Sequence, residues 1–176
     1  MKPKRRIDLY MLQKGKASFL GVILALAGLL LPLYLLMPIK GVDIPRAWDI
    51  LFLLTVTGVI LSRMLHPFYH RLVSNLIALS KISKMKKNGI DMLPLFFSRW
   101  EAAFIKIAPL TDLTFLGLLG LIFLPGFILP LLLTFLSTNL WSSAADAVHA
   151  FYILRYTDSS QLIRWTGEGF EIWEMD

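Results

Sequence analysis

Long stretches without a charged residue constrain this chain more than any other feature of its sequence. No charge occurs from Ala17 to Ile39, a run that exceeds the ~20 residues needed to cross the hydrocarbon core of a bilayer. A second uncharged run, between Asp112 and Asp146, is too long for one helix. Only 17% of the residues are charged and 56% are hydrophobic, whereas a soluble domain carries about 25% charged residues. The composition therefore predicts an all-α fold, a polytopic membrane helix bundle with the lipid bilayer as its partner.

The first half of the chain predicts two membrane-spanning helices. Ser18 to Met37 forms the first, and it stays uncleaved because it is longer than the 7–15-residue apolar core that is typical of a signal peptide. The second begins near Ala47 and continues, partly apolar, to Leu79. Pro67 lies inside it, removes one backbone donor and disfavours a helical conformation at the residue before it. We therefore expect a kink or break there.

The second half predicts two further spans, which makes about four in total. Asp91 to Pro109 mixes charged and apolar residues and is typical of an interfacial or partly embedded helix. The third span follows it and ends near Ser137, where a Ser-Thr-Asn sequence offers turn and capping side chains. The fourth runs from about Asn139 to Tyr156. Three residues are expected to bend the third span: Pro125, Gly126 and Pro130.

Basic residues flank the apolar runs and predict the orientation of the chain. Met1 to Lys16 carries six lysines and arginines against one acid, and Arg63 to Lys87 is also basic. Cytoplasmic flanks carry such an excess, so both termini are predicted to be cytoplasmic and the connection Lys40–Asp49 to lie outside. The formal net charge of +6 is explained in the same way, and nucleic acid is not an expected partner. Residues 1–156 form the predicted bundle, and residues 157–176 form a polar cytoplasmic tail, a small strand or hairpin covering it.

The three histidines of the chain fall in two places. His66 and His70 are four residues apart, so both imidazoles lie on one face of a helix and can reach one metal ion. His149 follows Asp146 by three residues in the last predicted span. Because the chain has no cysteine, imidazole and carboxylate are its only plausible transition-metal ligands. The spacing of the first pair is that of the zinc motif His-Glu-x-x-His, with Pro67 at the position of the glutamate.

These residues carry a resemblance to a known family. The chain resembles bacterial membrane domains of unknown function that are described as zincin peptidases akin to the site-2 intramembrane metalloproteases. The similar segments are His66-Pro-Phe-Tyr-His70, Arg99-Trp100…Ala108-Pro109-Leu110 and Ala144-Ala145-Asp146…Leu154-Arg155-Tyr156…Gly167-Glu168-Gly169-Phe170-Glu171-Ile172. Together they cover most of the chain beyond the first span.

The resemblance implies a metal site and a bacterial cytoplasmic membrane as its location. In such families two histidines and a carboxylate on a later helix hold zinc, and the matching residues here are His66, His70 and Asp146. The catalytic glutamate of the family corresponds to Pro67, which has no carboxylate to accept a proton. The resemblance therefore implies a degenerate or weakly active zinc metallopeptidase whose substrate would be a membrane protein or peptide, and no catalytic residue is identified.

Two functional hypotheses from different classes remain open at this stage. In the first, Asp146 and the two histidines bind zinc. In the second, the protein is a non-catalytic structural or partner-binding membrane protein, the histidines are incidental, and Asp146 pairs with Arg63, Arg71 or His149 between helices. Two further acids could in principle replace the missing base, but nothing in their spacing places them near Pro67, and they are expected to be solvated at the interface: Glu101 and Asp112.

Overall fold

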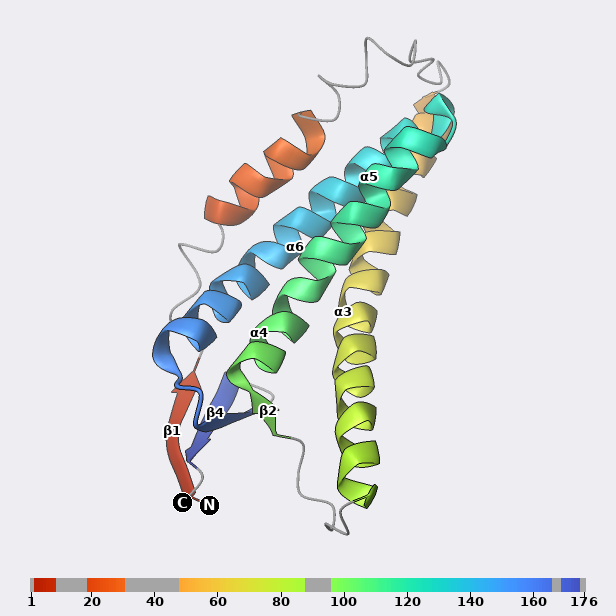
Figure 1. Ribbon diagram of the computed structural model, residues 1–176. Coiled ribbons are helices and arrows are strands. Elements are labelled where there is room, and N and C mark those ends of the chain that lie inside the picture. The colour runs from red at the N-terminus through yellow and green to blue at the C-terminus, as the bar shows by residue number, and fades with distance from the viewer. Residues whose placement is uncertain (1, 9–18, 31–47, 88–95, 166–168, 175–176) are drawn as a thin grey trace.

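A bundle of helices with a small sheet at one end makes up the fold. The computed structural model describes residues 2–8, 19–30, 48–87, 96–165 and 169–174. The helices are Phe19–Leu30, α3 (Trp48–Lys87), α4 (Arg99–Ala108), α5 (Thr114–Phe123) and α6 (Leu129–Tyr156). Helices α5 and α6 extend away from the sheet, α3 runs the length of the molecule and ends at the level of the sheet, and Phe19–Leu30 lies beside α6 (Figure 1). The predicted all-α helical bundle is confirmed.

Three helical segments are long and apolar enough to cross a membrane, which fits an integral membrane protein. They are Asp49–Ile82, Arg99–Phe123 and Gly126–Tyr156 among the residues that the structure describes. The first predicted span, Ser18–Met37, is represented by the shorter apolar helix Phe19–Leu30. Its remaining positions, 18 and 31–37, and residues 40–47 of the predicted outer connection lie outside the described residues.

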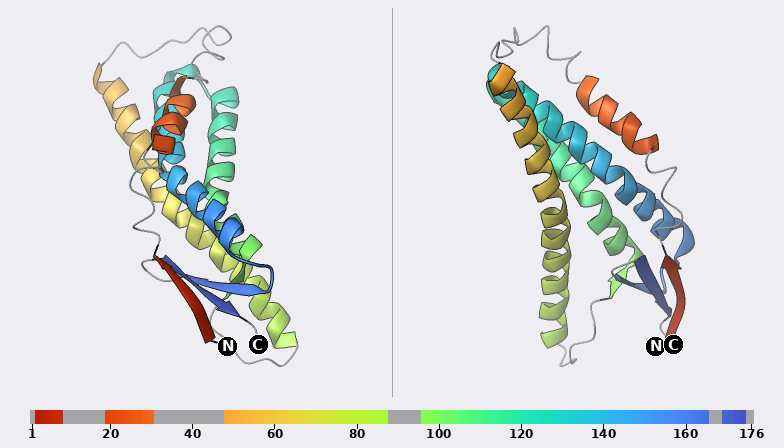
Figure 2. Two further views of the ribbon diagram at one scale, coloured as in Figure 1. Left: turned by 90° about the vertical axis from the view of Figure 1, so that its left-hand side faces the viewer. Right: turned by 180° about the vertical axis from the view of Figure 1, so that it is seen from behind.

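Helix α3 passes through Pro67 without interruption, so of the expected kink or break the break does not occur. The helix changes direction in its middle part instead (Figure 2, right). A proline ring removes one backbone hydrogen bond and pushes away the preceding turn, which bends a helix when the flanking turns are held by packing. Those turns are held here because α3 packs along α6 over much of its length.

The predicted boundary between the third and fourth spans is wrong. The chain reverses direction at the short 3-10 helix Gly126–Ile128, and α6 then runs unbroken from Leu129 through Ser137 and Asn139. Pro130 lies in the first turn of α6, where a missing N–H costs nothing. Two polar side chains of the Ser-Thr-Asn sequence bond to neighbouring helical segments. The Ser137 hydroxyl donates to the Ala25 carbonyl at 3.0 Å, and the Asn139 amide donates to the Pro109 carbonyl at 3.1 Å. Turn-forming side chains in a membrane helix thus serve as contacts between helices.

The segment predicted as Asp91–Pro109 begins its helix at Arg99 and becomes the first half of the candidate span Arg99–Phe123. Ser98 caps α4 by accepting from the Glu101 N–H, and Glu101 in turn accepts from the Ser98 N–H, a reciprocal capping box. A five-residue π-helix, Pro109–Leu113, joins α4 to α5. Residues 91–95 lie outside the described part of the chain.

A four-stranded sheet closes one end of the bundle. Its order is β1-β4-β3-β2, formed by Lys2–Asp8, Gly169–Glu174, Gln161–Trp165 and Phe97–Ser98, with every neighbouring pair antiparallel. The C-terminal residues do form a hairpin, as expected, and two strands from elsewhere extend it. The pairing of β1 with β4 brings the N-terminal strand beside the C-terminal one (Figure 2).

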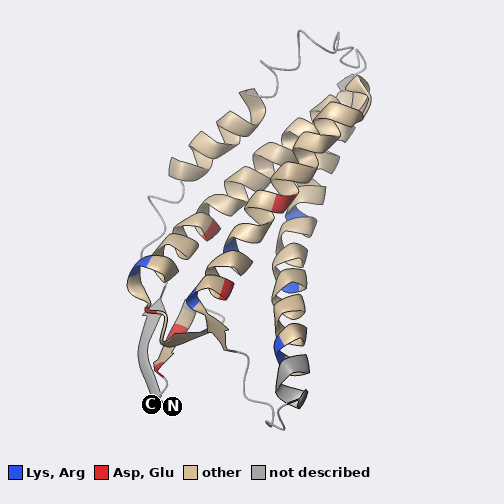
Figure 3. Cartoon of the chain, in the orientation of Figure 1, with Lys and Arg blue, Asp and Glu red and all other residues tan. Residues whose placement is uncertain are grey.

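Helices α3 and α6 pack closely against each other at Gly58. At Gly58 a Cβ atom would collide with the Leu131 carbonyl and the Thr134 hydroxyl, so the two helices meet almost backbone to backbone. Apart from Asp49, the described charged residues lie from the middle of the bundle to its sheet end (Figure 3).

Candidate metal site

Three sequence-predicted residues meet between α3 and α6. His66 and His70 come from successive turns of α3, and Asp146 comes from α6. The Nε2 atoms of the two imidazoles lie 2.8 Å and 2.9 Å from the same oxygen, Asp146 Oδ2. His66 and Asp146 are buried, and their ligand atoms and that of His70 all lie within 4.8 Å of one another. The helical spacing of the histidines thus places both rings on the face that α6 covers.

The second nitrogen of each imidazole is held by an acceptor, which decides where the ring protons lie. His70 Nδ1 is 2.8 Å from the Ile105 carbonyl oxygen, and a carbonyl can only accept a hydrogen bond. His66 Nδ1 is 3.1 Å from Asn139 Oδ1. Both histidines therefore carry their proton on Nδ1 when neutral and present the Nε2 lone pair to Asp146. Metal-binding histidines are usually oriented in this way, by a hydrogen bond from the ring nitrogen that does not bind the metal.

Asn139 is oriented by its own partners. Its amide nitrogen donates to the Pro109 carbonyl at 3.1 Å and to the Thr114 hydroxyl at 3.2 Å, which leaves Oδ1 to face His66. Pro109 begins the π-helix between α4 and α5, and such wide turns alter the backbone hydrogen-bond pattern of a helix. The π-helix therefore supports the site through a carbonyl that fixes Asn139, and Asn139 fixes His66.

A lysine approaches the other side of the carboxylate. Lys106 Nζ, from α4, donates to Asp146 Oδ1 at 3.0 Å, and its ammonium also lies 4.9 Å from the centre of the Trp165 ring in β3. The cluster is thus shared by α3, α4 and α6 and is connected to the sheet. Lys106 and Asp146 share an ion pair, the usual arrangement when charges of opposite sign are buried within apolar helices.

Other charged and polar groups near the cluster have separate partners or none. His149 Nδ1 lies 4.0 Å from Asp146 Oδ1, and neither of its ring nitrogens has a hydrogen-bond partner among the described residues. Arg63 and Arg71, proposed as partners for Asp146, are exposed, and no ion pair between either of them and Asp146 occurs in the described part of the chain.

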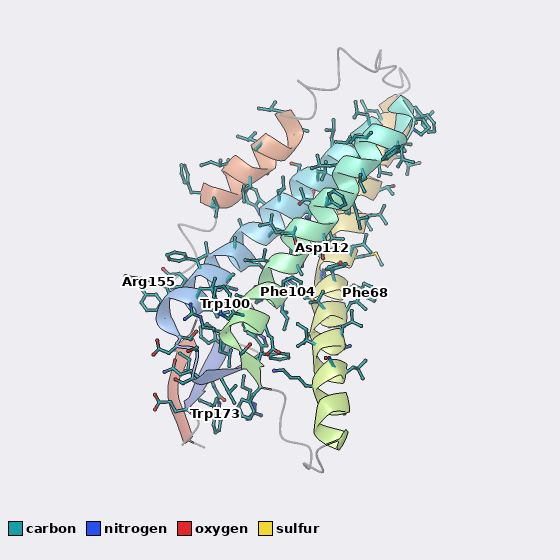
Figure 4. The ribbon with its side chains drawn as sticks, viewed as in Figure 1. Phe68, Trp100, Phe104, Asp112, Arg155 and Trp173 are labelled. Atoms are coloured by element: carbon teal, nitrogen blue, oxygen red, sulfur yellow. The ribbon has the colours of Figure 1, made fainter. Side chains whose placement is uncertain are left out.

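The two acids weighed as replacement bases are used elsewhere. Glu101 caps α4 and bonds Lys81 from α3. Asp112 lies on the side of its helix that faces α3 (Figure 4), where Tyr69 donates a hydrogen bond to its carboxylate at 2.7 Å. Neither group is hydrogen-bonded to the three clustered residues, so both stabilise contacts between helices.

Two residues of this site were missed by sequence reasoning. Lys106 lies in the segment Asp91–Pro109, which is predicted to be interfacial, and Asn139 is predicted only as the start of the fourth span. A signal for Lys106 was present, because a lysine between two isoleucines in a membrane-length segment needs a partner, and Asp146 is a lone carboxylate in the next segment. No signal in the sequence pairs Asn139 with His66, because that contact depends on how α6 packs.

Comparisons with known proteins identify no relative. No family model, no curated protein and no solved structure matches the chain.

Proposed function

We propose that this chain is a zinc-binding protein of the bacterial cytoplasmic membrane that holds one ion with His66, His70 and Asp146. We further infer that it is a degenerate or weakly active relative of the intramembrane zinc peptidases that it resembles. The metal-binding part of the proposal comes from the site, and the peptidase part comes from the resemblance.

The observation that carries the proposal is the direction of the imidazole lone pairs. Two neutral histidines that donate through Nδ1 would aim two lone pairs at a carboxylate oxygen, an arrangement that repels unless a positive charge lies among them. If each Nε2 atom also carried a proton, His66 and His70 would both be imidazolium cations. Their ring centres are 5.0 Å apart, so the two cations would repel each other. One metal ion attracts both lone pairs and the carboxylate at once.

The residues present fit a zinc ion in type and number. Two imidazoles and a carboxylate with room for further ligands are typical of catalytic-type zinc sites. With bonds of ~2.0–2.1 Å, tetrahedral ligand atoms lie roughly 3.3 Å apart, about half an ångström more than the two Nε2–Oδ2 distances of 2.8 Å and 2.9 Å. When bound, zinc acts as a Lewis acid and activates water.

The position of the site in the bilayer follows from helix geometry and flanking charge. At 1.5 Å per residue His66 lies roughly 25 Å along α3 from Asp49, within a hydrocarbon core of about 30 Å. The basic flanks favour a cytoplasmic location for the sheet and for both termini, which puts the site near the cytoplasmic boundary. A cysteine introduced at Gly41 should then be labelled by an impermeant reagent only from outside; labelling only from the cytoplasm would contradict this orientation.

Metal analysis of the detergent-purified protein tests the zinc site. After zinc loading and gel filtration, we expect about one zinc per chain, and His66→Ala and His70→Ala should each abolish it. His149→Ala is the matched control, since it removes an imidazole from the same neighbourhood and should retain the metal. A folded protein with no metal, or equal zinc in all four proteins, would contradict the proposal.

The peptidase part has its own test at Pro67. Pro67 is exposed on α3, where a larger side chain can be accommodated. Positioned acid–base catalysis is typically worth ~10²–10⁴-fold, so Pro67→Glu should raise any cleavage of a membrane-protein substrate. Robust cleavage by the unmodified chain, abolished by His66→Ala and by chelation, would overturn the inference of a degenerate enzyme. If Pro67→Glu keeps its zinc but shows no cleavage, the peptidase inference fails and the zinc site stands.

A second candidate function is a non-catalytic structural protein, and one observation favours it. The Lys106–Asp146 ion pair joins α4 to α6 without any metal. In that case zinc binding would be absent, and His66→Ala would lower stability only.

A further inference from the structure

A line of polar side chains runs along the contact between α3 and α6. On α3 it repeats every four residues, and on α6 every three or four, so each helix turns these side chains toward one side. We call this the polar seam, and its residues are Ser62, His66, His70, Asn139, Ser143, Asp146 and His149. The seam lies within two of the candidate membrane spans.

Part of the polar seam lacks a hydrogen-bond partner among the residues that the structure describes. There, the hydroxyls of Ser62 and Ser143 make no hydrogen bond although both residues are 0% exposed, and both buried ring nitrogens of His149 make none either. Other hydroxyls of α6 do find partners: Thr134 donates to the Pro130 carbonyl at 2.8 Å, and Ser137 bonds another helix. Buried polar groups are almost always satisfied by protein or by ordered water.

The unpartnered groups lie on both sides of the His66–His70–Asp146 cluster. Ser62 is one turn before His66 on α3. On α6, Ser143 is one turn before Asp146, and His149 is one turn after it. A buried water molecule typically makes about three hydrogen bonds, and the seam supplies both donors and acceptors at this spacing.

We propose that the polar seam binds exchangeable water molecules through Ser62, Ser143 and His149, and that these supply water to the cluster inside the bilayer. Water binding by the seam is independent of any metal. Its use as a reactant or ligand at the cluster rests on the proposed function. A site surrounded by apolar helices needs such a source, because the hydrocarbon core holds no water.

The absence of native cysteine makes a spectroscopic test possible. In Ser62→Cys or Ser143→Cys the introduced thiol is the only one, and infrared spectroscopy can follow its exchange from S–H to S–D in heavy water. Ala144→Cys is the matched control, because Ala144 is next to Ser143 and 1% exposed but is not part of the seam. We expect exchange at both seam positions to be at least tenfold faster than at position 144, with and without zinc. Equal rates at all three positions would overturn the proposal.

Alanine substitution gives a second measurement that does not depend on a foreign thiol. If the hydroxyls bond water, Ser62→Ala and Ser143→Ala should lower the thermal midpoint by about 2–4 °C, the cost of one hydrogen bond in a chain of this size. In a dry seam, removal of an unsatisfied hydroxyl would raise the midpoint, and that result would overturn the proposal. Ser137→Ala is the control for loss of a hydroxyl with a known protein partner. If the seam thiols exchange fast but the protein binds no zinc, water binding by the polar seam is supported and only its role at a metal centre is excluded.

Discussion

Replacing Asp146 by asparagine separates the metal site from the ion pair, because both depend on the same carboxylate. Asp146→Asn keeps the size of the side chain and removes its charge. Without metal, the change leaves the Lys106 ammonium without its carboxylate, and loss of one partner from a fully buried pair costs about 3–5 kcal/mol. Lys106 keeps 21% of its side chain exposed, so we expect the lower end of that range or less.

The effect of Asp146→Asn on zinc binding is measured as the rise in thermal midpoint that zinc causes in each protein. Zinc at 100 times its dissociation constant stabilises the folded state by about 2.7 kcal/mol. For a chain of 176 residues this raises the thermal midpoint by roughly 5–10 °C. We expect that rise in the native protein and none in Asp146→Asn, because the variant loses the anionic ligand.

The assay is thermal unfolding in detergent with a chelator and with saturating zinc. Asp112→Asn is the matched control, since it alters another carboxylate in the helices that bonds Tyr69 and lies outside the cluster. It should lower the midpoint but keep the rise with zinc. An equal rise in Asp146→Asn would refute the assignment of this carboxylate as a ligand. No rise in the native protein would refute the zinc site and leave the Lys106 pair as the role of Asp146.

Two further predictions concern the supports of the site. Asn139→Leu should weaken zinc binding about 10–100-fold in a chelator competition, because His66 loses the acceptor that fixes its proton; unchanged affinity would show that Asn139 does not position the ring. Gly58→Ala should cost about 1–3 kcal/mol in unfolding, because its Cβ collides with the α6 backbone. Gly126→Ala, with no atom within 4 Å of its Cβ, should be neutral, and equal losses at both glycines would contradict the close approach of α3 and α6.

Helical periodicity alone predicts which side chains of α3 share a face. Phe68 points away from the bundle (Figure 4) and is 58% exposed, whereas His66 and His70 face α6. This division follows from helical periodicity, which links a residue to its neighbours three or four positions away. Spacing therefore sufficed to predict that the two histidines share a face, and composition sufficed to predict the membrane bundle.

The position at which the chain reverses between α5 and α6 could not be predicted from local spacing. Pro125, Gly126 and Pro130 favour a bend, and so does the Ser-Thr-Asn sequence ending at Asn139, and both lie within one uncharged run. The choice depends on which position lets α6 pack along α3. Placing the reversal at Gly126 lets Asn139 and Asp146 share one helix and both reach His66.

The sequence by itself determined which side chains can ligate a metal: imidazoles at helical spacing, a carboxylate in a later apolar segment and no thiol. Tertiary structure alone decided that Asp146 faces those imidazoles, that Lys106 takes its second oxygen, and that Asn139 orients His66. The reason is sequence separation. These contacts join residues from 40 to 80 positions apart, and they form only when α3, α4 and α6 pack together, which no local pattern encodes.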